Sequence, residues 1–548
     1  MSMDSFDHII VGAGSAGSLL ANRLGADGKR SLCVLEAGPP DTNRWLHVPA
    51  GYMKTLFDPS VTWQLKTAPC DTINGRQLEI PQGRTLGGSS SVNGMLYVRG
   101  QPIDYDTWAA RGNPGWGYAE LLPYFKRFER RIDEQGGAGD ARYRGSAGEL
   151  PVTTPDFPNT LCDAFIDSAV ARGFPRNPDH NGERQEGAGR VQTVIHRGRR
   201  FSAATAFLHP AVKKGNVHVR TDSLVSRVRF EGKKAVGVDY IDGDGNTQSV
   251  NARLGVILSA GPIQSPKILQ LSGIGPAALL TQFGIPVLHD RAAVGEGLRD
   301  HYSPRFTFRA APESDSINNF TRGFALALQV VRWKLGLPSI LAIGPAVCHA
   351  YGKTDPSLNE PDFTMLFGPA SMKAGFFGRM DDYPGMTCGA WKQRPDSTGY
   401  VRITSGDPRQ APAFNPRYLS DERDQVTLVK ALKILRSVFT TEPMSRYVVA
   451  ETQPGPQVQS DDEWLDFARR MGSSSWHMMG SCRMGPQSDA STTVGPDLEV
   501  HGVEGLHVVD ASVMPTMSSA NTYASTMVVA EKASDLILGK APPLAATF

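Results

Sequence analysis

A glycine-rich turn near the N-terminus constrains this chain more than any other feature. An apolar run over residues 8–11 leads into Gly12-Ala13-Gly14-Ser15-Ala16-Gly17. When such a G-x-G-x-x-G follows a strand and opens a helix, its backbone amides can approach a pyrophosphate at the helix N-terminus. Gly12 would allow the tight turn, Gly14 the close approach of the ligand, and Gly17 the packing of helix on strand.

The residues after this turn complete a nucleotide-binding pattern. The sequence predicts a helix over residues 16–24 and a buried parallel strand over residues 31–35, which ends at Glu36. A carboxylate about 20 residues after the turn accepts hydrogen bonds from the adenosine ribose. The sequence therefore predicts a site for an ADP-containing dinucleotide. The alternative is a glycine-rich turn in an ordinary α/β protein.

Bulk properties narrow the remaining classes of function. A chain of 548 residues is too long for one core, which predicts two closely connected domains. A net charge of +2, with no block of Lys and Arg, argues against nucleic acid as a partner. The six cysteines are scattered and form no C-x-x-C pair, which indicates reduced thiols in a cytoplasmic protein and argues against a disulfide reductase.

Neither a leader nor a membrane-spanning segment is expected. Two aspartates precede the first apolar run, which is unlike a signal peptide. No apolar run reaches the ~18 residues that a transmembrane helix needs. The nearest approach is residues 324–351, which Arg332, Lys334 and Pro338 interrupt. We expect this segment to be buried or to face a substrate, with peripheral contact at the inner face of the membrane as the alternative.

Local patterns place several further elements. Residues 115–129 indicate an amphipathic helix, and residues 217–259 a β-meander with a tight hairpin at 242–245. Residues 254–261 indicate another buried strand that ends in a small-residue turn. Residues 306–464 combine loops, aromatic residues and strand-like runs, and they are the candidate for a second, substrate-binding domain. Shorter patterns predict a strand near 399–404, a helix over 421–440, a strand over 506–510 and a helix from about Ser525.

Two polar tracts are candidates for chemistry. Residues 83–94 are rich in glycine and hydroxyl groups, which lets a backbone lie close against a flat or charged ligand; a flexible surface loop is the alternative. Residues 473–485 hold His477 among Trp and Met side chains. Such an apolar setting lowers the pKa of a histidine and favours the neutral base, although a single histidine of this kind is more often structural.

These tracts carry a family resemblance. The chain resembles the glucose–methanol–choline (GMC) flavin oxidoreductases over essentially its whole length, and among them the bacterial choline- and aliphatic-alcohol-dehydrogenase-like branch. The signatures are the N-terminal pattern that ends at residues 35–38, the tract 83–93, and the run 261–275. Tyr97, Gly100 and Asp106 follow the second signature at the family's spacing. The order Trp-His, Cys-Arg-Met-Gly, Asp-Ala-Ser and Asn-Thr near the C-terminus adds a fourth agreement.

The resemblance implies an α/β fold of mixed α+β character. A Rossmann-like FAD-binding domain would be assembled from the discontinuous segments 1–155, 201–305 and 465–548. A substrate-binding domain, built on an antiparallel sheet with helices, would take residues 306–464 and an excursion over residues 156–200. The third FAD-binding segment would carry the catalytic residues.

The resemblance also implies the residues of the site. His477 matches the family's active-site histidine, Asn521 matches the second catalytic position, and Tyr523 would lie in the substrate pocket. No metal ion is expected. The residues implied for binding FAD are Gly12, Gly14, Ser15, Ala16, Gly17, Glu36, Ala37, Arg84, Gly87, Gly88, Ser89, Asn93, Gly94, Met95, Val225, Ala260, Trp476, Asp510, Ala511, Asn521 and Thr522.

The chemistry that the resemblance implies is oxidation of a primary alcohol to the aldehyde. An alcohol O–H is a poor acid, and hydride leaves its carbon readily only as the oxygen becomes an alkoxide. A neutral His477 could take that proton, and Asn521 could donate to the developing alkoxide. Flavin N5 would take the hydride. The partners would be a small alcohol and an electron acceptor, either oxygen or a quinone- or dye-type molecule; residues 324–351 favour an aliphatic or aromatic alcohol.

The sequence departs from the family pattern in four places. Val92 stands where relatives with covalent flavin have a histidine, so FAD should be non-covalent. Tyr523 replaces a frequent Asn, the loop 295–301 lacks the usual Asn and Gln, and Ser525 replaces a frequent Pro. These changes leave open a hydroxynitrile lyase or a light-driven fatty acid decarboxylase. A non-catalytic flavin protein and a nicotinamide dehydrogenase are further alternatives, which His477 with Asn521 and the family signatures argue against.

Overall fold

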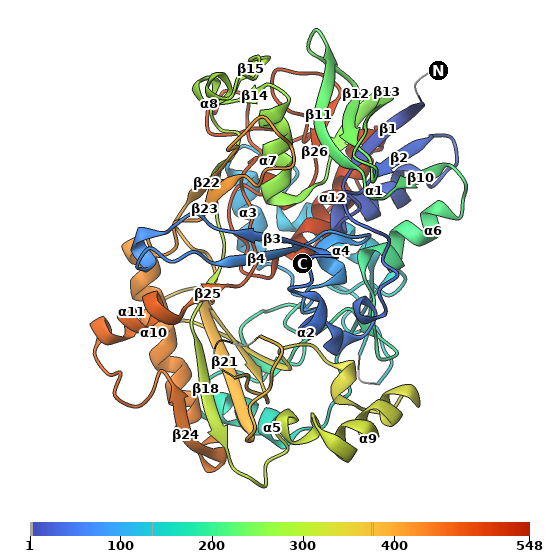
Figure 1. Ribbon diagram of the computed structural model, residues 1–548. Helices are drawn as coiled ribbons and strands as arrows, with labels where there is room; N and C mark the ends of the chain where they lie inside the picture. The colour runs from blue at the N-terminus through green and yellow to red at the C-terminus, as the bar shows by residue number, and fades with distance from the viewer. Residues whose placement is uncertain (1–3, 134, 374, 376) are drawn as a thin grey trace.

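Two β-sheets organise the protein in its computed structural model, which describes residues 4–133, 135–373, 375 and 377–548. The strands of the first sheet lie in the upper half of Figure 1, together with the C-terminal helix drawn in red. The strands of the second sheet, drawn mostly in yellow and orange, lie in the lower half. Each sheet has its own large hydrophobic core, so the length of the chain is divided as the surface-to-volume argument requires.

The first sheet is the nucleotide-binding type of sheet that the N-terminal pattern predicts. Its strand order is β10-β2-β1-β13-β12-β11, and β26 pairs with β13. Five of its strands run parallel, and β11, β12 and β13 form an antiparallel meander. The strands are β1 (Ser5–Val11), β2 (Leu32–Leu35), β10 (Val217–Arg220), β11 (Leu224–Glu231), β12 (Lys234–Ile241), β13 (Thr247–Leu258) and β26 (Leu506–Val508).

Most predicted elements of this half are confirmed, with small corrections. Helix α1 spans Ser15–Leu24, and the amphipathic helix is α4, Tyr118–Phe128. The predicted meander over residues 217–259 is too long, because β10 pairs with β2 in parallel instead of joining β11. The last helix, α12, begins at Thr522 and not near Ser525.

Helix α12 (Thr522–Leu538) ties the C-terminus to the first sheet. Its residues 523–535 are all buried, as expected for a helix that neighbours cover on every side. It packs against α1, and Arg23 of α1 pairs with the buried Glu531 at 2.8 Å. Residues more than 500 positions apart are therefore adjacent, which Figure 1 shows as a red helix beside a blue one.

The second sheet is antiparallel throughout, with strand order β24-β18-β21-β20-β19-β7. Helices α5 and α10 pack against it. Its first strand in the chain, β7, comes from a segment far from the other five. The elements are β7 (Gly187–Arg190), β18 (Arg305–Ala310), β19 (Cys348–Gly352), β20 (Phe363–Gly368), β21 (Gly385–Lys392), β24 (Val448–Gln453), α5 (Thr160–Ala171) and α10 (Glu422–Phe439).

Shorter elements connect and cover the two sheets. Two of the small strand pairs matter for the site: the hairpin of β3 and β4, and the antiparallel pair of β17 and β25. The remaining bounds used below are β3 (Thr62–Lys66), β4 (Glu79–Gly83), β8 (Ile195–His196), β9 (Arg199–Arg200), β17 (Tyr302–Ser303), β25 (Ser473–Ser474), α3 (Pro102–Ala110), α7 (Gly261–Leu271), α9 (Gly323–Lys334) and α11 (Asp461–Met471).

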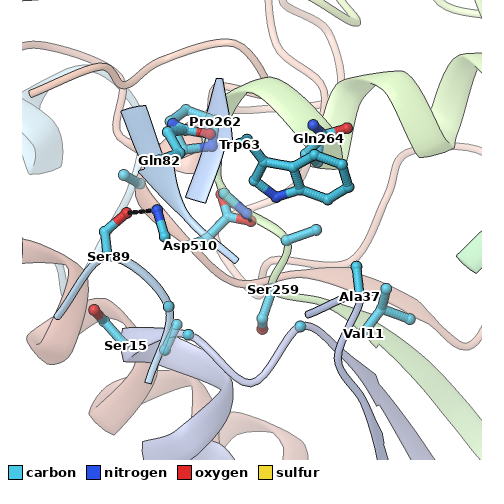
Figure 2. A pocket seen from close by; sticks show the side chains of 18 of the residues that line it. Val11, Ser15, Ala37, Trp63, Gln82, Ser89, Ser259, Pro262, Gln264 and Asp510 are labelled. Atoms are coloured by element: carbon cyan, nitrogen blue, oxygen red, sulfur yellow. Dashed lines mark hydrogen bonds between the residues drawn. The ribbon is translucent and has the colours of Figure 1, made fainter. Parts of the chain in front are cut away.

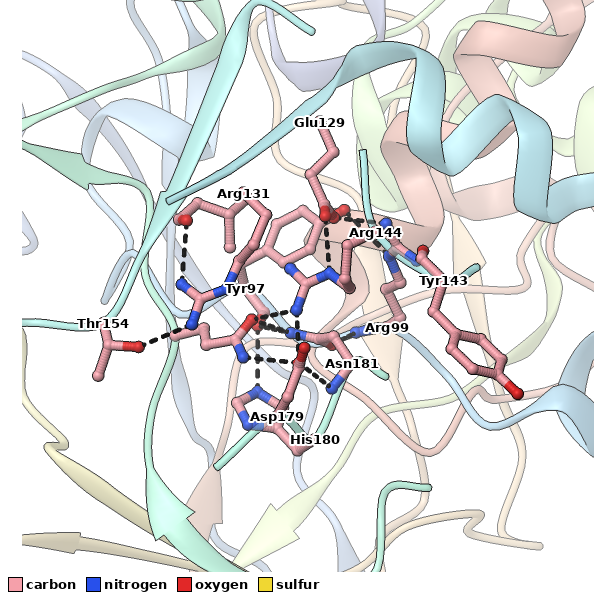
Figure 3. A network of polar contacts seen from close by, with 12 residues as sticks. Tyr97, Arg99, Glu129, Arg131, Tyr143, Arg144, Thr154, Asp179, His180 and Asn181 are labelled. Atoms are coloured by element: carbon pink, nitrogen blue, oxygen red, sulfur yellow. Dashed lines mark hydrogen bonds and ion pairs between the residues drawn. The ribbon is translucent and has the colours of Figure 1, made fainter. Parts of the chain in front are cut away.

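A buried polar network holds the chain that leaves the tract 83–94 (Figure 3). Glu129 lies between Arg99 and Arg144, with Arg144 Nε 2.8 Å from its carboxylate. Burial raises the pKa of Glu129, but the two guanidinium groups outweigh burial and hold it below its usual value. Asn181 accepts from Arg99 N and donates to Tyr97 O. Because a buried ion pair costs free energy when either partner is lost, this network pins residues 97–99 in place.

The prediction that residues 324–351 are buried or substrate-facing is wrong for the first part of that segment. Helix α9 contains no buried residue, whereas β19 at the other end of the segment is fully buried. The physical reason is that α9 lies outside the second sheet and is not one of its core helices. Among the described residues, no helix is both long enough and apolar enough to cross a bilayer.

Candidate functional site

One cavity lies where the parallel strands β1, β2 and β13 end, the edge at which open α/β sheets bind ligands. The space within it that protein atoms leave free is about 1210 Å³, part of which is open solvent. Figure 2 shows Trp63 and Gln82, from β3 and β4, on one side, with Val11, Ser15 and Ala37 on the other. The turn between β1 and α1 and the turn between β13 and α7 complete the wall.

The three glycines of the first turn have different roles. Gly12 has φ +99°, and a Cβ on it would lie 2.6 Å from Ser259 O. A Cβ on Gly17 would lie 1.9 Å from Gly12 O, so the helix can approach the turn only with glycine there. A Cβ on Gly14, by contrast, would have only Gly88 Cα near it, at 3.9 Å. Gly12 and Gly17 therefore serve the fold, and Gly14 leaves open the space that a pyrophosphate would take.

Helix α1 and Glu36 offer complementary groups to a nucleotide. Gly14 is the N-cap of α1 and provides no side-chain cap, so the first amides of the helix are open to an anion. The buried Glu36 carboxylate accepts from Ala13 N and Gly38 N, each at 2.9 Å. Burial raises the pKa of Glu36 to about 7. Its two oxygens have further lone pairs that ribose hydroxyls could use.

The glycine and serine tract forms the opposite wall. Gly88 has φ +52°, and a Cβ on it would lie 2.7 Å from Gly14 Cα, so the two backbones nearly touch. The buried Arg200 holds the tract, since its Nη1 donates to Ser90 O at 3.1 Å and to Asn93 Oδ1 at 2.8 Å. Burial lowers the pKa of Arg200 to about 9. Its Nε and Nη2 have no hydrogen-bond partner among the described residues. Buried polar atoms are usually paired, so these two nitrogens are available to a polar group that enters beside the tract.

Two short strands bring two histidines together. Strands β17 and β25 pair antiparallel, and Ser475 N donates to His301 O at 2.9 Å. His301 thereby lies beside His477, although 176 positions separate them. Asn521 reaches the same place from the start of α12: it is the N-cap residue, yet its side chain makes no cap hydrogen bond and contacts His477 instead.

A single carbonyl decides where the protons sit on both rings. Gln393 O can only accept, so His301 Nε2, at 2.6 Å, donates to it. A neutral His301 then has its lone pair on Nδ1, which accepts from His477 Nδ1 at 2.9 Å. The lone pair of His477 is consequently on Nε2, 2.8 Å from Asn521 Nδ2. This chain of groups presents an unprotonated nitrogen, which is what a general base needs.

Burial keeps both rings neutral. It lowers the pKa of His301 to about 4 and, together with the neighbouring His301, lowers that of His477 well below its usual value. Asp300 fixes the backbone at this point, because its Oδ1 accepts from His477 N at 2.7 Å and its Oδ2 from Tyr418 Oη at 2.6 Å. Trp476, with φ +61°, turns the chain sharply just before His477. Backbone conformations of this kind persist only where the surroundings enforce them.

Most of the residues expected to bind a cofactor line the one cavity. Those that line it are Gly12, Gly14, Ser15, Ala16, Glu36, Ala37, Gly88, Ser89, Asn93, Val225, Ala260, Trp476, Asp510, Ala511 and Thr522. Tyr523, which was expected in the substrate pocket, lines the same cavity. Gly17, Arg84, Gly87, Gly94 and Met95 lie just behind this lining. Arg84, for example, stacks over the ring of Trp63 at 4.9 Å, and Gly87 N donates to Ala13 O at 2.8 Å. His477 and Asn521 adjoin lining residues along the chain.

The structure also shows site residues that the sequence analysis did not assign. Trp63 and Gln82 belong to a hairpin without a recognisable motif, and no local signal could have found them. His301 directly follows Asp300 at the end of the loop 295–301, which lacks the usual Asn and Gln of the family. The Asp300-His301 pair itself was the signal in the sequence that could have pointed to it. Gln393 contributes through its backbone, which no residue pattern reveals.

Two of the four departures, the loop 295–301 and Ser525, are accommodated by neighbours. A Cβ on Gly297 would lie 1.2 Å from Arg483 Nη1, so glycine makes room for that arginine. Arg299 Nη1 donates to Pro395 O at 2.9 Å, and Ser525 Oγ lies 3.0 Å from Tyr105 Oη. Tyr523 is different: its buried hydroxyl has no partner among the described residues. It lines the cavity and is free to bond a ligand there.

Comparison with known proteins agrees with this site. Residues 6–303 match the N-terminal family model described as GMC oxidoreductase, and residues 395–530 match the C-terminal one. The oxygen-dependent choline dehydrogenase of Photobacterium profundum is 38% identical over 542 residues, which cover 98% of this chain and 94% of that protein. The enzyme of the same name from Brucella ovis is 37% identical over 536 residues, with coverage of 98% and 96%.

Solved structures show the same fold. Pyridoxine 4-oxidase from Mesorbium loti superposes with a TM-score of 0.85 at 29% identity, covering 96% of this chain and 98% of that one. A formate oxidase variant from Aspergillus oryzae RIB40 has a TM-score of 0.91 at 23% identity, with 98% of both chains covered. The second likeness is one of fold alone.

Proposed function

Because this chain belongs to the GMC oxidoreductase family, we propose that it is an FAD-dependent enzyme that oxidises a primary alcohol to the aldehyde. The observation that carries the proposal is the position of His477, whose Nε2 lone pair is directed to Asn521 at 2.8 Å beside the dinucleotide-type cavity. FAD, when bound, supplies the hydride acceptor at N5 of its flavin. The protein supplies binding, orientation and the proton acceptor.

The residues present fit FAD. The open amides of α1 and the space at Gly14 suit its pyrophosphate, and Glu36 suits the adenosine ribose. Ser89 and Asn93 line the cavity on the opposite side. Val225 and Ala260 line the cavity as well, and their backbone would hold the adenine. These groups would recognise a dinucleotide through backbone and hydroxyl contacts, which suits a wall built of glycine and serine.

His477 and Asn521 would act on the alcohol oxygen. In the free protein Asn521 Nδ2 bonds the lone pair of His477 Nε2, so an entering hydroxyl would displace this contact and take its place. His477 would then accept the hydroxyl proton, a contribution worth about 10²–10⁴-fold in rate. Asn521, released from the ring, could donate to the oxygen as negative charge develops there.

The relatives' names point to the class of substrate. Choline and pyridoxine, after which two of them are named, are both alcohols. The exposed α9 removes the reason to prefer an aliphatic or aromatic alcohol.

We propose oxygen or a quinone- or dye-type molecule as the electron acceptor. All six cysteines are free and buried, which favours a reducing compartment such as the cytoplasm.

The proposed function is tested by mixing the purified flavoprotein anaerobically with alcohols and following the visible flavin absorbance. The panel should include choline, pyridoxine, aliphatic alcohols and benzyl alcohols. Bleaching by any of them would establish alcohol oxidation, and recovery on admitting air would separate an oxidase from a dehydrogenase by its speed. Absence of bleaching across the panel would reject the proposal and favour a flavin-dependent reaction without net oxidation.

We further propose that FAD is bound without a covalent link. Val92 stands at the position where relatives with covalent flavin have histidine, and its buried isopropyl group packs against Leu46 and Val61. A hydrocarbon side chain has no nucleophile for such a bond. Acid precipitation of the holoprotein should therefore leave all of the flavin in the supernatant. Yellow colour retained in the washed pellet would contradict this prediction.

A further inference from the structure

Helix α9 carries an apolar stripe that faces away from the protein. Phe324, Leu328, Val331 and the adjoining Leu335 are 84%, 46%, 52% and 69% exposed. They follow one another at intervals of four, three and four positions, so they lie on one face of the helix. Figure 1 shows α9 at the lower edge of the molecule, beyond the second sheet. An exposed row of this kind marks an interaction site and not chance surface.

Four cations gather at the C-terminal end of α9, two of them flanking the stripe and two on a hairpin that packs against the other side of the helix. Arg332 and Lys334 lie in the last turn of α9, and Arg197 and Arg199 lie on the hairpin of β8 and β9. Trp333 joins the two elements, since its Nε1 donates to Gly198 O at 2.7 Å and the Arg199 guanidinium lies 5.6 Å from its ring. We call Arg197, Arg199, Arg332 and Lys334 the basic cluster.

The basic cluster is not neutralised by its surroundings. Within the described part of the chain, none of its four members forms a salt bridge, although Arg332 Nε donates to Pro338 O at 2.8 Å. Residues 316–354 and 191–202 contain no Asp or Glu. Positive charge is therefore concentrated at the C-terminal end of the helix that carries the stripe, and the partner of this face should be anionic.

A second copy of this chain fits this face poorly. In a twofold dimer the stripe meets itself, and residues 316–354 of the second copy offer no Asp or Glu to the cations of the basic cluster. An acidic protein would satisfy the charges but would not need four aliphatic and aromatic side chains projecting from one helix. A bilayer with anionic lipid satisfies both features. An amphipathic helix of this kind buries its apolar face ~5–10 Å into the headgroup boundary, with its cations at the headgroups.

We propose that α9 is a membrane-docking helix, which rests in the headgroup region of a bilayer containing anionic lipid. The chain that follows α9 passes to Gly344, where a Cβ would lie 2.6 Å from Gly94 O. The docked face is thus linked by a short segment to the tract that lines the cavity. Apolar molecules dissolved in the bilayer would then be near the site. The inference itself rests on α9 and does not depend on the proposed reaction.

The test is flotation of the full-length flavoprotein with lipid vesicles. Vesicles of phosphatidylcholine with phosphatidylglycerol should carry the protein upward, and vesicles of phosphatidylcholine alone should carry much less. High salt should weaken the binding, because exposed charges are screened. Lys334→Glu should weaken binding to the anionic vesicles by at least about fivefold, the contribution of one cation near such a surface.

A matched pair of variants tests the apolar stripe. Val331→Glu in α9 should weaken binding by at least about tenfold, because it places a carboxylate in the buried face of the helix. Val426→Glu, at a 49% exposed position of α10, should bind as the unmodified protein does. Flavin content and thermal unfolding would show that both variants are folded.

Three outcomes would overturn the proposal. The first is absence of flotation with anionic vesicles at low salt. The second is equal binding by the Val331→Glu and Val426→Glu variants. The third is a dimer that Val331→Glu dissociates in sedimentation experiments, which would assign the stripe to a second copy of the chain.

Discussion

Replacing His477 by alanine should lower the rate of anaerobic flavin reduction by an alcohol by about 10²–10⁴-fold, the usual worth of a general base. The hydrogen-bond chain from Gln393 leaves His477 Nε2 unprotonated, with its lone pair directed to Asn521. Its loss removes the proton acceptor but none of the contacts of the nucleotide wall. The measurement is stopped-flow absorbance of the reconstituted variant, with FAD content determined in parallel.

The pH dependence of the unmodified protein provides the matching control. Burial and His301 hold the pKa of His477 well below its usual value. Since the neutral ring is the base, its activity is lost only as the pH falls through this lowered pKa. The reduction rate should thus stay level from about pH 8 to below pH 6.5, the ordinary pKa of histidine. A rate that falls with a midpoint near 6.5, or a His477→Ala variant that reduces its flavin normally, would refute the assignment.

Replacing His301 by leucine should slow the same reaction by about 10–10²-fold, the value of one hydrogen bond to a charged group. His301 is not among the residues that line the cavity, and it would act on His477 as a positioning residue. Its Nδ1 accepts the Nδ1 proton of His477 at 2.9 Å. Without this acceptor, the lone pair of His477 is no longer held on Nε2, and the imidazolium formed on proton uptake loses a stabilising partner. Stopped-flow flavin reduction measures the effect.

A double variant separates this role from a merely structural one. In a His477→Ala background, His301→Leu should cause no further loss, because residues that act as one unit are not additive. His301→Gln, whose side-chain carbonyl can accept from Nδ1, should recover part of the rate. Full additivity, or equal rates for the leucine and glutamine variants, would show that His301 only fills space. The midpoint of thermal unfolding would detect any general loss of structure.

Much of the first sheet was predictable because its signals are local. The turn at Gly12, the helix α1 and the strand that ends at Glu36 follow from spacing and residue type within about 30 consecutive positions. Helix α4 followed from its amphipathic pattern in the same way. Helix α12 begins three residues before the predicted start, and Asn521, a residue type that favours the N-cap, was the available signal.

The errors arose where burial decides the outcome. Residues 324–351 are mostly apolar in the sequence, yet α9 is exposed and β19 is buried. Apolar content does not tell the two elements apart, because the neighbours decide which of them is covered. Similarly, β10 shares the alternating pattern of the meander but pairs with β2, since strand pairing depends on which edge is available.

The sequence by itself determined the dinucleotide-type turn and the resemblance to one family. That resemblance in turn led to the proposal that His477 and Asn521 are the catalytic pair. These features reside in residue types at short spacing, where local geometry and side-chain chemistry are sufficient. Only the tertiary structure decided that His301 contacts His477 and that Gln393 O sets the protons on both rings. It alone also decided that the stripe of α9 is exposed. Those properties depend on contacts between segments up to 176 positions apart, and a contact is created by packing and not by the residues alone.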